Sequence, residues 1–235
     1  MLDNLNQAIF GLYPYVVISV FFVGSLIRFD RDQYTWRSGS SQLLRRKSLL
    51  IGSNCFHIGV IAILGGHFVG LLTPHEFYTA AGLSVAAKQM LAMVAGGVFG
   101  AIGFFGLTLL IYRRLADARI RATSSRMDIA ILLLLYLQLI IGLSSIFASA
   151  QHLDGSEMLK LSGWAQHIVT LQGDAAGMLA DVDPVFKVHI ALGMTIFLLF
   201  PFSRLVHIWS MPIGYIGRSY QIVRRRGGTT VVRGR

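Results

Sequence analysis

The chain has 235 residues, of which 54% are hydrophobic and only 14% are charged. This composition is too apolar for an ordinary soluble domain and is typical of a protein that crosses a membrane several times. Cys55 is the single cysteine, which excludes an intrachain disulfide and a cysteine-ligated iron–sulfur cluster.

Five hydrophobic stretches are long enough to cross a bilayer, which takes about 20 apolar residues. In chain order they are Phe10–Ile27, Leu49–Leu72, Ala86–Tyr112, Ile129–Phe147 and Val185–Trp209. Asp183 and Pro184 precede the fifth stretch as a helix N-cap and a first-turn proline. The sequence therefore predicts an all-α, polytopic membrane protein with five transmembrane helices in a bundle.

Basic residues mark one side of this predicted bundle. All of the 21 Lys and Arg residues except Lys88, Lys160 and Lys187 lie in the first and third links or at and beyond the end of the fifth stretch. The positive-inside rule therefore predicts a cytoplasmic C-terminus and an outside N-terminus, in the cytoplasmic membrane. This asymmetry accounts for the net charge of +10 without nucleic acid, and no nucleic-acid-binding module is recognisable.

Two segments outside the spans complete the domain organisation. Residues 158–171 place Leu161, Trp164, Ile168 and Leu171 at helical spacing, which predicts an amphipathic helix lying on the outer surface. Residues 1–220 form the predicted transmembrane domain. Residues 221–235 form a basic cytoplasmic tail, flexible or ordered against a partner or anionic membrane lipid.

Four of the seven histidines lie in the second and fifth spans. Because these spans run in opposite directions, His67 is predicted to lie opposite His189 near the outer face. His57 lies opposite His207 nearer the cytoplasm. Facing imidazoles at two depths suit two bis-histidine haems, since haem offers two axial positions and neutral imidazole is a good iron ligand. The second ring nitrogen of each ligand is expected to donate to a carbonyl or hydroxyl.

The spacing of these histidines conflicts with straight helices. His189 and His207 are about 27 Å apart along an ideal helix, whereas His57 and His67 are only about 15 Å apart. Tilted helices or inclined haems would reconcile the two distances. Pro201 lies between His189 and His207 and is expected to kink the helix, so the helix face that the two histidines share is approximate. The alternative is that these imidazoles are hydrogen-bonding groups between packed helices. The remaining histidines, His75, His152 and His167, are expected to be interfacial or loop residues.

Three basic residues near the span ends have two interpretations each. Lys88 begins the third span, and its position alone favours a snorkelling side chain over a hydrogen-bond donor to a quinol oxygen. Arg114 and Arg204 end the third and fifth spans, where they could pair with haem propionates or with lipid headgroups. Arg204 lies on the same side of its helix as His207, which favours the propionates.

Long stretches of the chain resemble the gamma subunit of respiratory nitrate reductase, a membrane dihaem cytochrome b. These stretches are QYTWRSGSSQLL, SNCFHIGVIAILGGHFVGLLTPH, KQMLAMVAGG, AQHLDGSEMLKLSGWAQ and HIALGMTIFLLFPFSRLVHIWSMP. The similarity runs from Tyr13 to about Tyr220, so the arginine-rich tail lies beyond it.

The resemblance implies a function and a set of site residues. His67 and His189 would hold a distal b haem, and His57 and His207 a proximal one. Lys88, Gly66 and His67 match positions of a menaquinol or ubiquinol site beside the distal haem. Quinol would be oxidised near the outer face with protons released outside. Electrons would then pass through both haems to an iron–sulfur beta subunit and a molybdenum catalytic alpha subunit.

Two other functions remain open from the sequence. One is a dihaem cytochrome b anchor of another quinone-linked iron–sulfur oxidoreductase. The other, from a different class, is a haem-free transporter or simple membrane anchor. The chain by itself has no ligand set for molybdenum or an iron–sulfur cluster, so it would act as a quinol-oxidising electron-transfer subunit.

Overall fold

The computed structural model describes residues 2–32 and 44–210, and within these ranges every regular element is a helix. Five helical segments are long and apolar enough to cross a membrane, which confirms the predicted five-helix membrane protein. They contain α2 (Tyr13–Asp32), α3 (Arg46–Leu72), α5 (Val85–Ala116), α7 (Arg126–Gln151) and α9 (Pro184–Leu199). The predicted tail, 221–235, lies outside the described residues.

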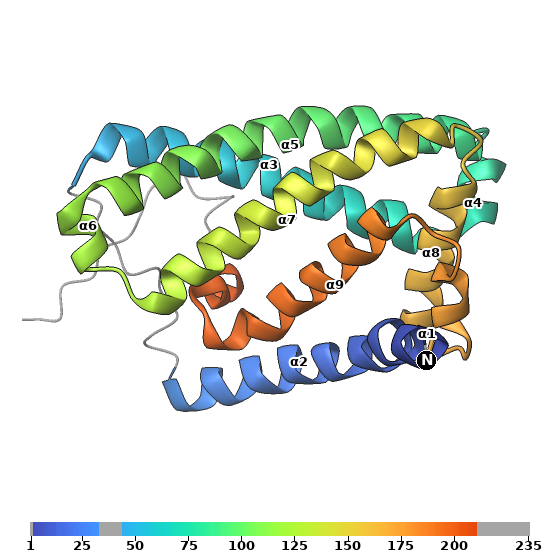
Figure 1. Cartoon of the computed structure of the whole chain (residues 1–235), viewed down its shortest axis with the longest axis horizontal. Helices are drawn as coiled ribbons and strands as arrows, with labels where there is room; N and C mark the ends of the chain where they lie inside the picture. Colours follow the sequence, from blue (N-terminus) through green and yellow to red (C-terminus); the bar gives the residue numbers. More distant parts are fainter. Residues whose placement is uncertain (1, 33–43, 211–235) are drawn as a thin grey trace, which may run out of the picture.

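The long helices run side by side along the molecule (Figure 1). Neighbours in contact follow the order α3, α5, α7, α9 and α2. The short helix α6 (Ala118–Ala122) joins α5 to α7 at one end, while α4 (His75–Ala80) and α8 (Ser156–Val169) lie at the other. Helices α3 and α9 carry three of the four histidines predicted as haem ligands, and in this series of contacts α5 and α7 lie between them.

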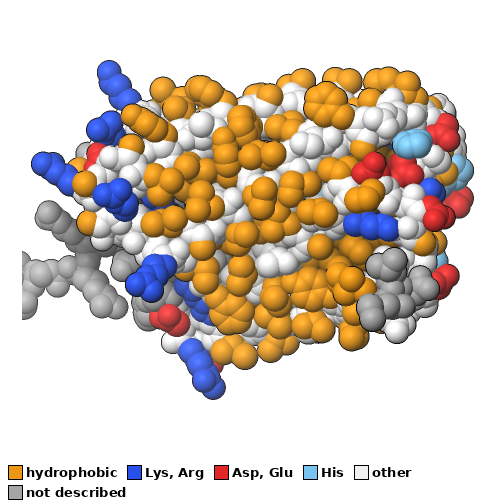
Figure 2. Space-filling model, viewed as in Figure 1, with side chains coloured by type: hydrophobic (Ala, Val, Ile, Leu, Met, Phe, Trp, Pro, Cys, Tyr) orange, Lys and Arg blue, Asp and Glu red, His pale blue; other side chains and the backbone are white. Residues whose placement is uncertain are grey.

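Charge is segregated between the two ends of the bundle. Lys and Arg side chains gather at the α6 end, hereafter the basic end, which includes Arg46, Arg113, Arg119 and Arg121 (Figure 2). Asp, Glu and His side chains gather at the α4 and α8 end, hereafter the acidic end, and hydrophobic side chains cover the surface between them. This pattern fits a molecule whose middle lies in hydrocarbon, and the side that each end faces stays a prediction.

Glycines let α3 and α5 approach closely. A Cβ atom built on Gly59 would lie 2.6 Å from the backbone N and Cα of Gly103 and from the carbonyl oxygen of Phe99. Gly52 of α3 and Gly106 of α5 are also in close contact, and this contact lies nearer the basic end. Small residues that bring two backbones together are a common basis of helix association in membranes, where burial of apolar surface offers little driving force.

The predicted amphipathic helix is present as α8, but its apolar side packs on the protein. Trp164 and Ile168 are buried in a core that includes Phe10 and Leu179. The Trp164 indole Nε1 donates to the Phe10 carbonyl oxygen at 2.9 Å, within the π-helical segment η1 (Gln7–Leu12) that precedes α2. The helix therefore closes the acidic end of the bundle rather than resting freely on the membrane surface.

The predicted fifth span, Val185–Trp209, is broken near Pro201 rather than only kinked there. Helix α9 begins at Asp183 and Pro184 as predicted but ends at Leu199. Two 3₁₀ segments follow, η4 (Phe200–Phe202) and η5 (Arg204–Ser210), separated by the extended residue Ser203. Proline lacks a backbone N–H and clashes with the preceding turn, so Pro201 ends the α-helix.

Arg28 of α2 stabilises this break. Its Nη1 donates to the carbonyl oxygens of Pro201 at 2.6 Å and Ser203 at 2.9 Å. The two carbonyls lie where the regular helical hydrogen bonds have stopped, and a buried carbonyl without a partner would be unfavourable. The chain can therefore turn within the bundle, and η5 folds back beside α2 and α7 (Figure 1).

Candidate functional site

The structure brings the four predicted histidines together in the two predicted pairs. The ring centroids of His67 and His189 are 6.1 Å apart, and those of His57 and His207 are 6.2 Å apart. Each pair joins α3 to the fifth span, with His189 on α9 and His207 on η5. The break at Pro201 removes the predicted mismatch in spacing, because His207 no longer lies on a straight helix from His189.

Three of the four rings are held by a carbonyl of their own segment. The Nδ1 atoms of His57, His67 and His207 lie 2.7, 2.8 and 2.6 Å from the carbonyl oxygens of Ser53, Ile63 and Arg204, respectively. A carbonyl can only accept, so in each ring Nδ1 carries the proton and donates. The Nε2 atom then keeps its lone pair, which is the form of imidazole that binds a metal.

The fourth ring, that of His189, is held differently. Its Nε2 lies 3.3 Å from the side-chain Nε2 of Gln138 on α7, and the same amide nitrogen donates to the His189 carbonyl oxygen at 3.1 Å. Its Nδ1 is buried and has no hydrogen-bond partner in the described part of the chain.

The dimensions of both pairs fit two axial ligands of one metal ion. With metal–nitrogen bonds of about 2 Å, the centroids of two imidazoles on opposite sides of a metal lie about 6 Å apart. The described residues hold no group of three or more His, Cys, Asp or Glu side chains that could form a protein-only metal site. A haem needs only two protein ligands, because its macrocycle supplies the others.

The helix face next to His67 is open. A Cβ atom built on Gly65, Gly66 or Gly70 would meet no other atom within 4 Å. A pocket of about 500 Å³ lies beside His57, lined also by Asn54, Ile61 and Phe99. A flat macrocycle can approach a glycine-rich helix face closely. The surroundings of both histidine pairs, and not only the ring separations, therefore fit a haem.

The predicted basic residues at the other end meet around one carboxylate. Asp128 Oδ2 lies 3.9 Å from Arg114 Nη1, and its Oδ1 lies 3.6 Å from Arg204 Nε. Arg114 Nη1 also donates to Ser124 Oγ at 2.8 Å. Since the Arg204 carbonyl oxygen holds the His207 ring, the cluster lies at the His57–His207 pair.

Lys88 is buried at the acidic end, so it is not a snorkelling side chain. Only 8% of its surface is exposed, and its Nζ lies 3.9 Å from the centre of the Tyr78 ring on α4. Neither Lys88 Nζ nor the Tyr78 hydroxyl has a hydrogen-bond partner among the described residues. Burial raises the pKa of Tyr78, and the Glu76 charge adds to the rise, so the phenol stays neutral.

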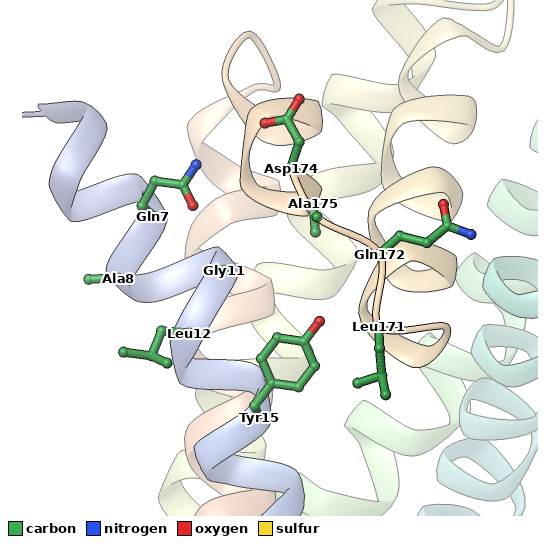
Figure 3. A pocket seen from close by; sticks show the side chains of 10 residues that line it. Gln7, Ala8, Gly11, Leu12, Tyr15, Leu171, Gln172, Asp174 and Ala175 are labelled. Carbon is green, nitrogen blue, oxygen red and sulfur yellow. The ribbon is translucent and has the colours of Figure 1, made fainter.

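The remaining three histidines belong to neither imidazole pair. His75 contacts Tyr78, His167 lies 3.4 Å from the Gly173 carbonyl, and the His152 carbonyl accepts from Gln89. A pocket of about 680 Å³ lies between η1 and the loop after α8, where Gln7, Tyr15 and Leu171 line it (Figure 3). No predicted site residue lines that pocket.

Sequence reasoning missed three residues of the site: Gln138, Asp128 and Tyr78. Asp128 had a local signal, because Ser125 and Asp128 form the capping box that begins α7. Gln138 was visible as the large polar group of the fourth span, but its partner His189 is 51 positions away. Tyr78 had no sequence signal.

Comparison with known proteins gives a consistent result. The family model described as nitrate reductase gamma subunit matches residues 6–226. The chain is 53% identical to the respiratory nitrate reductase 2 gamma chain of Escherichia coli strain K12 over 226 residues, which cover 96% of this chain and 100% of that relative. It is 53% identical to the nitrate reductase 1 gamma chain of the same strain, over 94% of this chain and 98% of that relative. It is 38% identical to the nitrate reductase gamma chain of Bacillus subtilis strain 168, over 94% and 99%.

Proposed function

Because this chain belongs to the nitrate reductase gamma subunit family, we propose that it oxidises quinol and passes the electrons across the membrane to the other subunits of the complex. The family makes it the membrane-anchoring cytochrome b subunit of a nitrate reductase, beside a catalytic and an iron–sulfur subunit. The names of its relatives favour this partner over another quinone-linked oxidoreductase.

The observation that carries the proposal is the pairing of four imidazoles at ring separations of 6.1 and 6.2 Å. His67 and His189 would hold a distal b haem, and His57 and His207 a proximal one. A bound b haem supplies a reversible one-electron couple at its iron. With two histidines holding each haem, no coordination position would be left for oxygen, which would suit electron transfer.

Lys88 and Tyr78 support a quinol site at the acidic end. A buried ammonium group without a hydrogen-bond partner is unfavourable unless a ligand supplies one. The Lys88 ammonium can donate to a quinol oxygen, and Gly66 leaves the surface of α3 open next to His67. Oxidation of quinol to quinone releases two electrons and two protons. The positive-inside rule predicts that the acidic end faces outside, where these protons would be released.

Arg114 and Arg204 support the proximal site at the basic end. Asp128 holds both guanidinium groups near η5. Guanidinium groups at this position are suited to a haem propionate, because guanidinium and carboxylate form strong charge-assisted hydrogen bonds. This end would face the iron–sulfur subunit in the cytoplasm.

The decisive experiment is a pyridine haemochrome assay on the purified complex from haem-replete cells. We expect two b haems per gamma chain and a reduced-minus-oxidised spectrum with a b-type band. A colourless chain would contradict the proposal and favour a simple membrane anchor.

Replacing Lys88 with alanine is expected to slow quinol oxidation while both haems remain. A hydrogen bond to a charged group contributes about 1.5–3 kcal/mol, which corresponds to a decrease of about 10- to 150-fold in kcat/KM. Steady-state kinetics with a quinol donor measure the effect. Lys160→Ala is the matched control, since this lysine lies on α8 and pairs with Glu157. Unchanged quinol kinetics in Lys88→Ala would leave Lys88 with a structural role alone.

A further inference from the structure

Helix α2 contacts the 3₁₀ segment η5 at both of its ends. Where η5 begins, Arg28 Nη1 donates to the carbonyl oxygens of Pro201 at 2.6 Å and Ser203 at 2.9 Å. Where it ends, the Trp209 indole Nε1 donates to Ser25 Oγ at 3.3 Å. Because the two contacts on α2 lie about one helical turn apart, α2 fixes both the start and the end of η5.

Apolar contacts support the same interface. The centroid of the Phe21 ring on α2 lies 4.7 Å from that of Phe200 and 5.6 Å from that of Trp209. Gly24 brings the backbone of α2 close to the break, because a Cβ atom built on it would lie 3.0 Å from the Cβ and Cγ atoms of Pro201. The residues of α2 that make these contacts recur at helical spacing on one face: Phe21, Gly24, Ser25 and Arg28.

The contact at Ser203 continues through the backbone to the His207 ring. Ser203 is buried and extended, and its Oγ accepts from the Leu205 backbone N–H at 3.2 Å, where η5 begins. The next carbonyl along the chain, that of Arg204, accepts from His207 Nδ1 at 2.6 Å. Arg28 therefore holds the residue immediately before the one whose carbonyl orients the imidazole.

The other three imidazoles lie on uninterrupted α-helix. His57 and His67 are on α3, and His189 is on α9 before the break. A continuous α-helix fixes the place of a ligand through its own backbone hydrogen bonds, whereas the hydrogen bonds of a 3₁₀ segment have poorer geometry. Among the four, His207 is thus the ligand whose position depends on how the chain is held after an interruption of the helix.

We infer that Arg28 is a positioning residue of the proximal haem, setting the place and the ring angle of His207 through the Pro201 and Ser203 carbonyls. This inference rests on the proposed role of His207 as a haem ligand. The ring planes of His57 and His207 are 75° apart. The competing explanation is that the guanidinium only stabilises the bundle as a whole. Loss of general stability would lower both haems together, and it would not change the ring angle of one pair.

Haem content and the low-spin ferric EPR spectrum of the membrane-bound complex separate these explanations. The EPR signal of a haem with two imidazole ligands depends on the angle between the ring planes, so it reports ring orientation without turnover. The proximal signal is first identified as the one missing in His57→Ala. Arg28→Leu removes the donor to both carbonyls, so proximal haem retention is expected to fall about tenfold and the remaining proximal signal to shift. The distal signal stays unchanged.

Arg31→Leu is the matched control, because it is the same substitution at an exposed arginine three positions further along α2. Both of its signals should equal those of the wild type. An unchanged proximal signal in Arg28→Leu, or equal loss of both haems, would overturn the inference. If Arg28→Leu does not accumulate, Trp209→Phe decides by the same outcomes, since it removes only the indole donor to Ser25. Absence of haem from the wild type would instead refute the proposed function.

Discussion

Replacing His189 with alanine is expected to lower the haem content from two to one per gamma chain and to stop quinol-driven electron transfer. The 6.1 Å pair with His67 would lose one of its two axial ligands, and a b haem has no covalent attachment to retain it. His67→Ala should have the same effect, because it removes the opposite ligand of the same site. The other pair, His57 on α3 and His207 on η5, is unchanged in both variants.

Pyridine haemochrome content and the number of redox components measure this result. His152→Ala is the control, since this histidine lies at the acidic end and belongs to neither pair. It should retain both haems. Loss of the proximal component alone in His189→Ala would show that the pairs are assigned wrongly.

The sequence was sufficient to predict which residues meet, but not the path of the chain between them. The five spans follow from hydrophobic length, and the pairing of His67 with His189 follows from antiparallel topology. Both predictions need only the positions of the residues along the chain. The end of α9 at Leu199 was harder to predict, because proline in a membrane helix can produce either a kink or a break. Arg28 on another helix stabilises the break, and a contact across 173 positions has no local signature.

The same reasoning explains what was missed within the site. A lysine at the start of a span most often reaches toward the interface, so its position alone favoured that interpretation. Burial of Lys88 depends on α4, whose Tyr78 ring covers the ammonium group. Helix α4 is six residues long and has no periodicity that a sequence pattern could reveal. Such short packing elements, rather than the spans, decide which polar groups are buried.

Replacing Gly59 with alanine is expected to destabilise the whole assembly, although alanine is the better helix former. In an open helix position, Gly to Ala adds up to about 1 kcal/mol of stability. At Gly59 the new Cβ would lie 2.6 Å from the backbone of Gly103 and from the Phe99 carbonyl, and backbone atoms cannot move aside as a flexible side chain can. Overpacking of this kind is unfavourable by about 1–3 kcal/mol, so the net effect reverses sign.

This destabilisation is expected to affect both histidine pairs, because α3 carries His57 and His67 and packs closely on α5. Thermal unfolding in detergent and haem content per chain should therefore fall together in Gly59→Ala, and further in Gly59→Leu. Gly96→Ala is the control on α5, where a Cβ meets nothing within 4 Å, and it should be neutral or stabilising. Equal stability of Gly59→Ala and Gly96→Ala would mean that close contact between α3 and α5 does not position the histidines.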